Sequence, residues 1–174
     1  PLARSARDLA TMMKLLAGSD GAEARAMKIS LPPVRQTKLK QFRVAVMLTS
    51  PESEVDEPVQ DLLAKLAAFL AKRVKALSLD ARPAFSTGEA MDVYITLLRA
   101  ATSRRQTEEE FAINAAKVKG FAAGDDSYYA KMLRAYVIPH RSWLMVNERR
   151  HQMRLLWDQF FENWDVMLCP AAAS

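Results

Sequence analysis

The chain has 174 residues, half of them apolar, which is enough for one domain with a substantial core. Its formal net charge of +5 comes from basic residues interleaved with acidic ones, a pattern more typical of a solvated surface than of a nucleic-acid groove. No apolar run approaches the length of a membrane span, and no signal-peptide pattern opens the chain. The single cysteine, Cys169, excludes an internal disulfide and fits a reducing compartment. The composition therefore predicts a cytoplasmic protein that binds neither nucleic acid nor membrane.

The first predicted helix follows Ser5. Ser5 and Asp8 have the spacing of a capping box, and apolar residues then recur on one face until Gly18, where we expect the helix to end. Residues 18–41 are rich in glycine, proline and charge, and they predict a long surface connection.

A β-α-β unit is predicted next. Residues 42–48 (FRVAVML) form an almost wholly apolar, β-branched run that predicts a buried strand. Pro58 marks the first turn of a helix whose apolar residues repeat at intervals of three and four. Residues 74–79 alternate between apolar and polar, as a second strand would, and the crossover between the strands is expected to be right-handed.

Three shorter helices are predicted after this unit. Their starts are indicated by polar residues with capping spacing: Ser86 with Glu89, Thr107 with Glu110, and either Asp125 or Asp126.

The longest helix is predicted from Pro139 to Asn163 or Trp164. Proline is tolerated in a first turn, and the large apolar residues that follow recur at helical spacing, so this face needs a large partner. Residues 165–168 come directly after it, with three apolar residues in succession before Pro170, and predict a short strand buried on both faces. The chain is thus predicted to be α/β, with about three strands covered by about six helices.

Spacing alone assembles no catalytic or metal-binding constellation. His140 and His151 are the two histidines, and they stand about 16 Å apart along one helix, so they cannot share a metal. Cys169 has no activating neighbour, which favours a buried structural thiol. There is no nucleophile elbow, phosphate-binding loop or dinucleotide-binding glycine run. We therefore expect neither a metal nor a cofactor.

Two segments together resemble the amidase signature family, which are serine hydrolases that cleave carboxamide C–N bonds. Residues 1–9 (PLARSARDL) resemble the family's G-P-[ML]-A-R-[ST]-x-x-D-L element without its first glycine. The closing segment resembles the family's helix followed by a D-V-L-L-x-P strand, through Trp157, Phe160-Phe161, Asp165-Val166, Leu168 and Pro170. Shorter matches between these two segments follow the order that the family shows, so the resemblance covers nearly the whole chain.

The resemblance implies a partial α/β/α fold around a mixed sheet, in an enzyme that uses a Ser-cisSer-Lys triad. An activated serine there forms an acyl-enzyme, and backbone N–H groups stabilise the oxyanion. These elements precede the P-L-A-R-S match in the family, and no serine of this sequence lies in a glycine-rich loop, so no catalytic residue is carried over. We expect the chain to be the C-terminal portion of an amidase and inactive alone. Its opening P-L-A-R and closing alanine run fit that expectation.

The resemblance also implies that this portion helps to enclose a small-molecule amide substrate. We expect one domain over residues 1–174, in which residues 85–138 form a helical insert that covers the substrate. The insert and the loop after the last strand indicate these pocket candidates: Tyr128, Tyr129, His140, Cys169 and Pro170. Three residues are expected to be structural: Arg4 pairing with a carboxylate, and Ser5 and Asp8 in the capping box.

Two alternatives stay open. One is a non-catalytic binding or regulatory module that retained the amidase scaffold. The other is a mostly helical interaction protein, which would require residues 42–48 and 166–168 to be helical. A partial sheet would also leave unpaired strand edges, which predicts self-association, so a homo-oligomer is possible.

Overall fold

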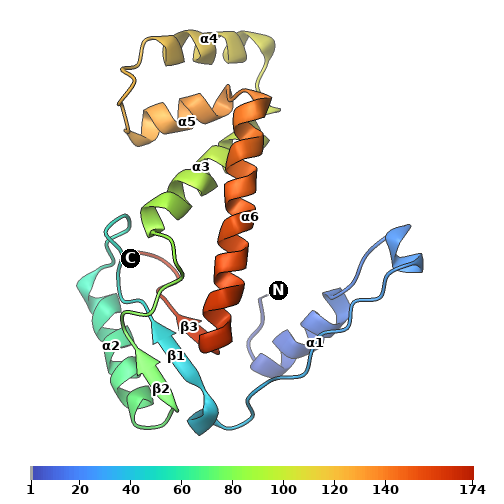
Figure 1. Cartoon of the computed structure of the whole chain (residues 1–174), viewed down its shortest axis with the longest axis vertical. Coiled ribbons are helices and arrows are strands. Elements are labelled where there is room, and N and C mark those ends of the chain that lie inside the picture. Colours follow the sequence, from blue (N-terminus) through green and yellow to red (C-terminus); the bar gives the residue numbers. More distant parts are fainter. Residues whose placement is uncertain (1) are drawn as a thin grey trace. The chain divides into compact units, whose positions relative to one another are not determined.

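The computed structural model describes residues 2–174, which form six α-helices, two short 3-10 helices and three strands (Figure 1). The contacts within the chain divide it into two units, one ending at Thr37 and one running from Lys38 to Ser174. The expectation of one domain over the whole chain stays a prediction. Among residues 2–174, no helix combines the length and the apolar character that crossing a membrane requires.

The first unit consists of α1 (Ala6–Leu16) and the connection that follows it, which includes the 3-10 helix Glu23–Arg25. The predicted start of α1 is confirmed, because the Ser5 hydroxyl accepts a hydrogen bond from the Asp8 N–H at 3.1 Å. The predicted end is not a glycine cap, since the helix stops before Gly18 and Ala17 is already extended. No residue of α1 is buried.

A three-stranded parallel sheet with the order β2-β1-β3 lies at one end of the second unit. The 3-10 helix Leu39–Gln41 leads into β1 (Arg43–Val46), which pairs with β2 (Ala76–Ser78) and with β3 (Val166–Leu168). The predicted β-α-β unit is therefore confirmed. Because residues 43–46 and 166–168 are strands, the mostly helical alternative is wrong.

Burial differs between the strands because only β1 has a strand on each side. Val44, Ala45 and Val46 are at most 4% exposed, and α2 (Glu57–Ala71) covers them by placing Ala67 in the same core cluster as both valines. β3 was predicted to be buried on both faces, and this prediction is wrong: all three of its residues are only half-buried. It is an edge strand of this sheet, and an edge strand presents backbone groups for further pairing.

Four helices make up the rest of the second unit (Figure 1). They are α3 (Thr87–Ser103), α4 (Glu108–Lys119), α5 (Tyr128–Tyr136) and α6 (His140–Asn163). α3 packs against both α5 and α6, and α4 packs against α5. The long α6 runs from the end that carries α4 and α5 back to the sheet, where it leads directly into β3 (Figure 1).

The predicted helix starts are confirmed to different degrees. Thr107 and Glu110 form the complete reciprocal capping box of α4. Ser86 caps α3 by accepting from the Glu89 N–H, whereas the Glu89 carboxylate pairs with an arginine of α6 instead of completing a box. The prediction of an aspartate cap on α5 is wrong. Ser127 is the cap, and the Asp125 carboxylate accepts from the Ser127 N–H at 3.0 Å.

The apolar face of α6 finds its partners in an aromatic cluster next to the sheet. Phe160 is 7% exposed, and its ring lies 5.5 Å from Trp157, 5.1 Å from Phe161 and 6.4 Å from Trp164, measured between centroids. Phe85, just before α3, makes an edge contact with Trp157 at 5.9 Å. The cluster thus joins the end of α6 to the segment that leads into α3.

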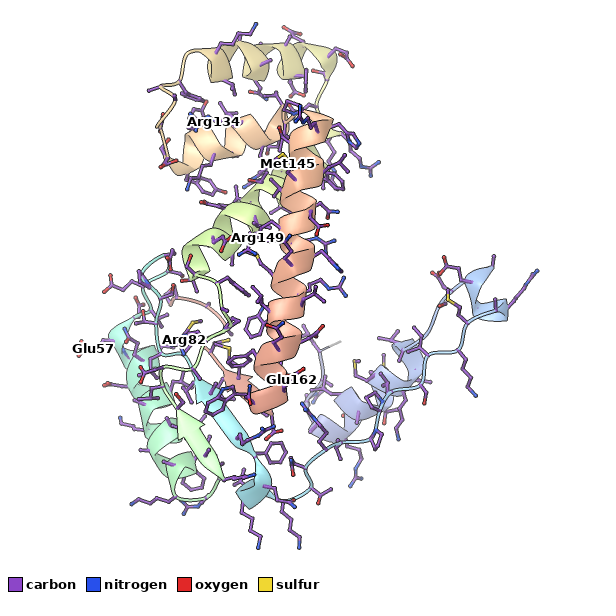
Figure 2. All side chains as sticks on the ribbon, viewed as in Figure 1. Glu57, Arg82, Arg134, Met145, Arg149 and Glu162 are labelled. Carbon is purple, nitrogen blue, oxygen red and sulfur yellow. The ribbon has the colours of Figure 1, made fainter. Side chains whose placement is uncertain are left out.

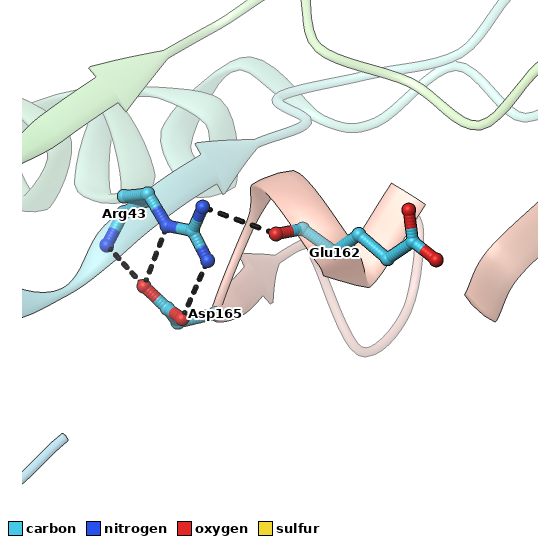
Figure 3. Close-up of polar contacts among 3 residues, drawn as sticks. All are labelled: Arg43, Glu162 and Asp165. Carbon is cyan, nitrogen blue, oxygen red and sulfur yellow. Dashed lines mark hydrogen bonds and ion pairs between the residues drawn. The ribbon is translucent and has the colours of Figure 1, made fainter. Parts of the chain in front are cut away.

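Asp165 fixes the turn from α6 into β3 (Figure 3). Its side chain is 4% exposed, and its carboxylate accepts from the Arg43 Nη2 at 3.0 Å, Nε at 3.1 Å and backbone N–H at 2.8 Å. Arg43 Nη1 also donates to the Glu162 carbonyl at 3.1 Å, near the end of α6, where the helix dipole favours a cation. The hydrogen bond to Asp165 raises the pKa of Arg43. One ion pair therefore holds β1, α6 and β3 together.

Candidate functional site

A cleft of about 520 Å³ opens at the carboxyl ends of the three strands. Met47 directly follows β1, Cys169 directly follows β3, and Arg82 comes shortly after β2. Ligands of open parallel sheets bind outside this end of the strands, because loops from neighbouring strands meet there. The lining residues are Met47, Thr49, Ser50, Pro51, Glu52, Arg82, Pro83, Phe85, Ser86, Thr87, Ala90, Trp157, Met167 and Cys169.

Most of the lining is apolar. Phe85 and Trp157, which lie far apart in the sequence, are in edge contact with each other and provide aromatic surface. Met47, just after β1, and Met167, in β3, add flexible thioethers. Ligand sites commonly combine such a lining with a few polar groups that fix orientation. The cleft therefore suits a molecule with an apolar body.

One polar group of the cleft is the cluster of Ser50, Glu52 and Thr87, which joins the loop after β1 to the start of α3. The Ser50 hydroxyl lies 2.5 Å from Glu52 Oε2 and 2.9 Å from Thr87 Oγ1, and the Thr87 hydroxyl donates to the same Glu52 oxygen. Ser50 is 8% exposed, and among residues 2–174 no other polar or charged residue is buried. The two hydroxyls thus tie the loop to the helix through a shared carboxylate.

Glycine at position 88 lets the Glu52 carboxylate approach the N-terminus of α3. A Cβ at this position would lie 2.9 Å from Glu52 Oε1, closer than Cβ atoms normally come. The hydrogen bond from Ser50, followed by those from Thr87 and from backbone N–H groups that include that of Gly88, lowers the pKa of Glu52. A helix N-terminus also favours an anion. Glu52 is therefore ionised and a weak base.

This arrangement does not activate a nucleophile. A serine becomes nucleophilic when a nearby base takes its proton, and an efficient base has a pKa near the working pH. Glu52 has the opposite property, since its hydrogen bonds from Ser50 and Thr87 stabilise the charged form. The cluster is thus suited to shaping the cleft rather than to attacking a substrate.

Arg82 supplies the positive charge of the cleft. Its Nη1 donates to the Val46 carbonyl at 3.2 Å and to the Ala81 carbonyl at 2.8 Å, which anchors the guanidinium to the end of β1. Figure 2 shows Arg82 between the carboxyl end of the sheet and α6. Arg82 as a whole is an exposed residue.

The lowered pKa of Glu52 predicts a pH-dependent contribution to stability. Because the folded-state pKa lies below the ordinary glutamate value of about 4.3, the contribution is complete above that value and is lost as pH falls through the folded-state pKa. We expect the difference in melting temperature between the wild type and Glu52→Gln to be constant from pH 8 to about 5 and to shrink in more acidic buffer. Thermal unfolding followed by circular dichroism checks this, and a difference that grows towards low pH would contradict it.

The family model described as Amidase matches residues 1–174. The chain belongs to the amidase family. No curated protein and no solved structure matched it.

In this amidase-family chain, the predicted pocket residues do not gather in one cavity. Cys169 lines the cleft and is exposed, so the expected burial of its thiol is wrong. His140 stacks on Trp143 and lines a separate pocket of about 440 Å³ beside α3 and α5. Tyr128 and Tyr129 lie on α5, which is at the far end of α3 and α6 from the sheet (Figure 1). Pro170, one residue beyond Cys169, is half-buried.

The structural residues predicted near the start of the amidase match lie in the first unit. Ser5 caps α1 through the Asp8 N–H. Among residues 2–174, no carboxylate lies within 4.0 Å of a guanidinium nitrogen of Arg4, so its role stays a prediction. Nowhere in residues 2–174 does a group of three or more histidine, cysteine, aspartate or glutamate side chains lie together so that it could hold a metal ion.

The polar residues of the cleft were not among the site residues predicted from the sequence. Ser50 and Glu52 follow a predicted buried strand, and Ser86 and Thr87 lie at the start of a predicted helix. Polar residues are ordinary at both places, so neither pair indicated a site. The rule that parallel strands place their carboxyl-end loops together could have indicated Ser50 and Arg82 as neighbours. Thr87 carried no such signal, because its contact with Ser50 spans 37 residues of sequence.

Proposed function

We propose that the complete protein containing these residues hydrolyses the C–N bond of small-molecule carboxamides through an acyl-enzyme, and that this chain supplies scaffold and part of the substrate pocket. The observation that carries the proposal is the apolar cleft at the carboxyl ends of the parallel strands, in a chain that matches the amidase family along its length. Cys169 and Pro170 belong to the loop that would contact the substrate.

The chain's own residues would bind and orient the amide. Phe85 and Trp157 offer an aromatic surface for an apolar acyl group, and the Ser50–Glu52–Thr87 cluster holds one wall of the cleft in place. Both hydroxyls of that cluster are bound to Glu52 and would not act as the nucleophile, which the family resemblance assigns to a Ser-cisSer-Lys triad. Tyr128, Tyr129 and His140 lie at the end of α3 and α6 farther from the sheet, and they would line a separate part of the substrate pocket.

Hydrolysis tests the catalytic part of this proposal. We expect protein expressed from the complete coding sequence to hydrolyse phenylacetamide and to react with a fluorophosphonate, which labels activated serines. The 174-residue chain alone should do neither above the buffer control. Hydrolysis at enzyme-like rates by the chain alone would overturn the division of roles.

A pair of substrates tests the role of the cleft. Phe85→Ala in the complete protein is expected to lower kcat/KM for phenylacetamide by about 10-fold or more, because an aromatic acyl group loses apolar contact. The value for acetamide, which has no such group, should change little. Phe69→Ala is the matched control, since Phe69 lies on α2 outside the cleft and is 51% exposed. Equal loss for both substrates would mean that Phe85 only supports the fold.

A non-catalytic binding module is the second candidate function. It is favoured by one observation: the hydroxyls of Ser50 and Thr87 are bound to an ionised carboxylate and are not activated. Such a module would bind phenylacetamide without turnover in the complete protein and would not react with the fluorophosphonate. The hydrolysis experiment therefore separates the two candidates.

A further inference from the structure

Arg82 has an unused hydrogen-bonding edge. Its hydrogen bonds to the carbonyls of Val46 and Ala81 both come from Nη1, and among residues 2–174 neither its Nε nor its Nη2 has a hydrogen-bond partner. No carboxylate of the described residues lies within 4.0 Å of its guanidinium. Nε and Nη2 form one side of the planar guanidinium, and two parallel N–H groups there match the two oxygens of a carboxylate.

In Arg43 the same pair of donors, Nε and Nη2, which we call the fork, binds a carboxylate. Arg43 directs its Nε to Asp165 Oδ2 and its Nη2 to Asp165 Oδ1, at 3.1 and 3.0 Å. Arg82 lines the cleft, and its corresponding pair of donors has no partner among residues 2–174. By analogy with Arg43, a carboxylate is the group that would accept hydrogen bonds from Nε and Nη2 of Arg82.

The other charge in the cleft is not available to neutralise Arg82. Glu52 is already held by the hydroxyls of Ser50 and Thr87 and by the Gly88 N–H. Both hydroxyls bind Oε2, and together with the Gly88 N–H they keep the carboxylate at the start of α3. The cleft thus combines the Glu52 carboxylate, which is already hydrogen-bonded, with the Arg82 guanidinium, which has two donors without partners among residues 2–174. The aromatic surface of Phe85 and Trp157 lines the same cleft.

We propose that the cleft selects ligands that carry a carboxylate, which binds the Nε and Nη2 of Arg82 while an apolar or aromatic body packs on Phe85 and Trp157. If the ligand is the amide substrate, which rests on the proposed function, the preferred substrates are amides whose acyl part ends in an acidic group. Arg82 is then a specificity-determining residue and takes no part in bond cleavage.

A pair of probes of matched shape tests this proposal on the 174-residue chain. 4-Phenylbutyrate and 4-phenylbutyramide differ in charge but hardly in size, and isothermal titration calorimetry in low-salt buffer gives both dissociation constants. We expect the acid to bind about 10-fold or more tightly than the amide, and the preference to weaken as salt is raised, because exposed charges are screened. Equal affinities, or no binding of the acid, would overturn the proposal.

Variants of Arg82 identify the group responsible. Arg82→Gln should abolish the preference for the acid while the amide binds as before, and Arg82→Lys, which keeps the charge but not the fork, should retain part of it. Arg154→Gln is the control, because Arg154 is an exposed residue of α6 outside the cleft. If Arg82→Gln also loses the amide by unfolding, the Lys variant decides: a reduced preference for the acid in a folded Lys variant supports the proposal, and an unchanged preference overturns it.

Titration without turnover keeps this proposal separate from the proposed function. An acid preference in a protein that hydrolyses no amide would leave Arg82 as a carboxylate site and would overturn only the hydrolase. Hydrolysis without an acid preference would overturn only the role of Arg82.

Discussion

Phe160→Ala is expected to lower the free energy of unfolding by about 3–5 kcal/mol, the range for truncating a buried aromatic side chain. Phe160 is 7% exposed, and its ring contacts those of Trp157, Phe161 and Trp164. Removing the ring leaves a cavity where α6 meets the sheet, and the three large neighbours cannot collapse into it without leaving their own positions.

Urea unfolding followed by circular dichroism at 222 nm measures this effect without depending on the nearby tryptophans. Leu155→Ala is the matched control, because Leu155 lies on the same helix but is 49% exposed, and its loss should cost about 1 kcal/mol or less. Phe160→Leu should fall between the two, since most of the volume is kept. Equal midpoints for the two alanine variants would show that the cluster contributes little to stability.

Asp165→Ala is expected to lower the melting temperature by about 5–10 °C, the second largest effect. The Asp165 side chain is 4% exposed and accepts three hydrogen bonds from Arg43, so its removal leaves a partly buried guanidinium and a backbone N–H without an acceptor. The remaining bond from Arg43 to the Glu162 carbonyl cannot compensate, because it uses a different nitrogen.

Thermal unfolding of matched variants checks this expectation. Asp158→Ala removes the same charge from an exposed position on α6 and should change the melting temperature by no more than a degree or two. Asp165→Asn keeps one acceptor oxygen and should melt between the wild type and the alanine variant. An Asp165→Ala protein that melts together with Asp158→Ala would show that the three hydrogen bonds do not hold β3.

The sequence by itself determined most of the local structure of this amidase-family chain. Ser5, Ser86 and Thr107 begin helices as their spacing predicted, Pro58 lies in the first turn of α2, and α6 covers the predicted span. These signals succeed because a cap or a helical period involves residues at most a few positions apart, which meet whatever the rest of the chain does.

The tertiary structure alone decided burial and the composition of the cleft. β1 and β3 are similar apolar runs, but only the strand order places β1 in the centre and leaves β3 half-buried at an edge. Cys169 is exposed because it follows that edge strand into the cleft. Arg43 meets Asp165 across 122 residues, and Ser50 meets Thr87 across 37, so no local pattern contains either pair. Side chains this far apart come together only when the parallel sheet brings their strand ends to one side, which is where the candidate site lies.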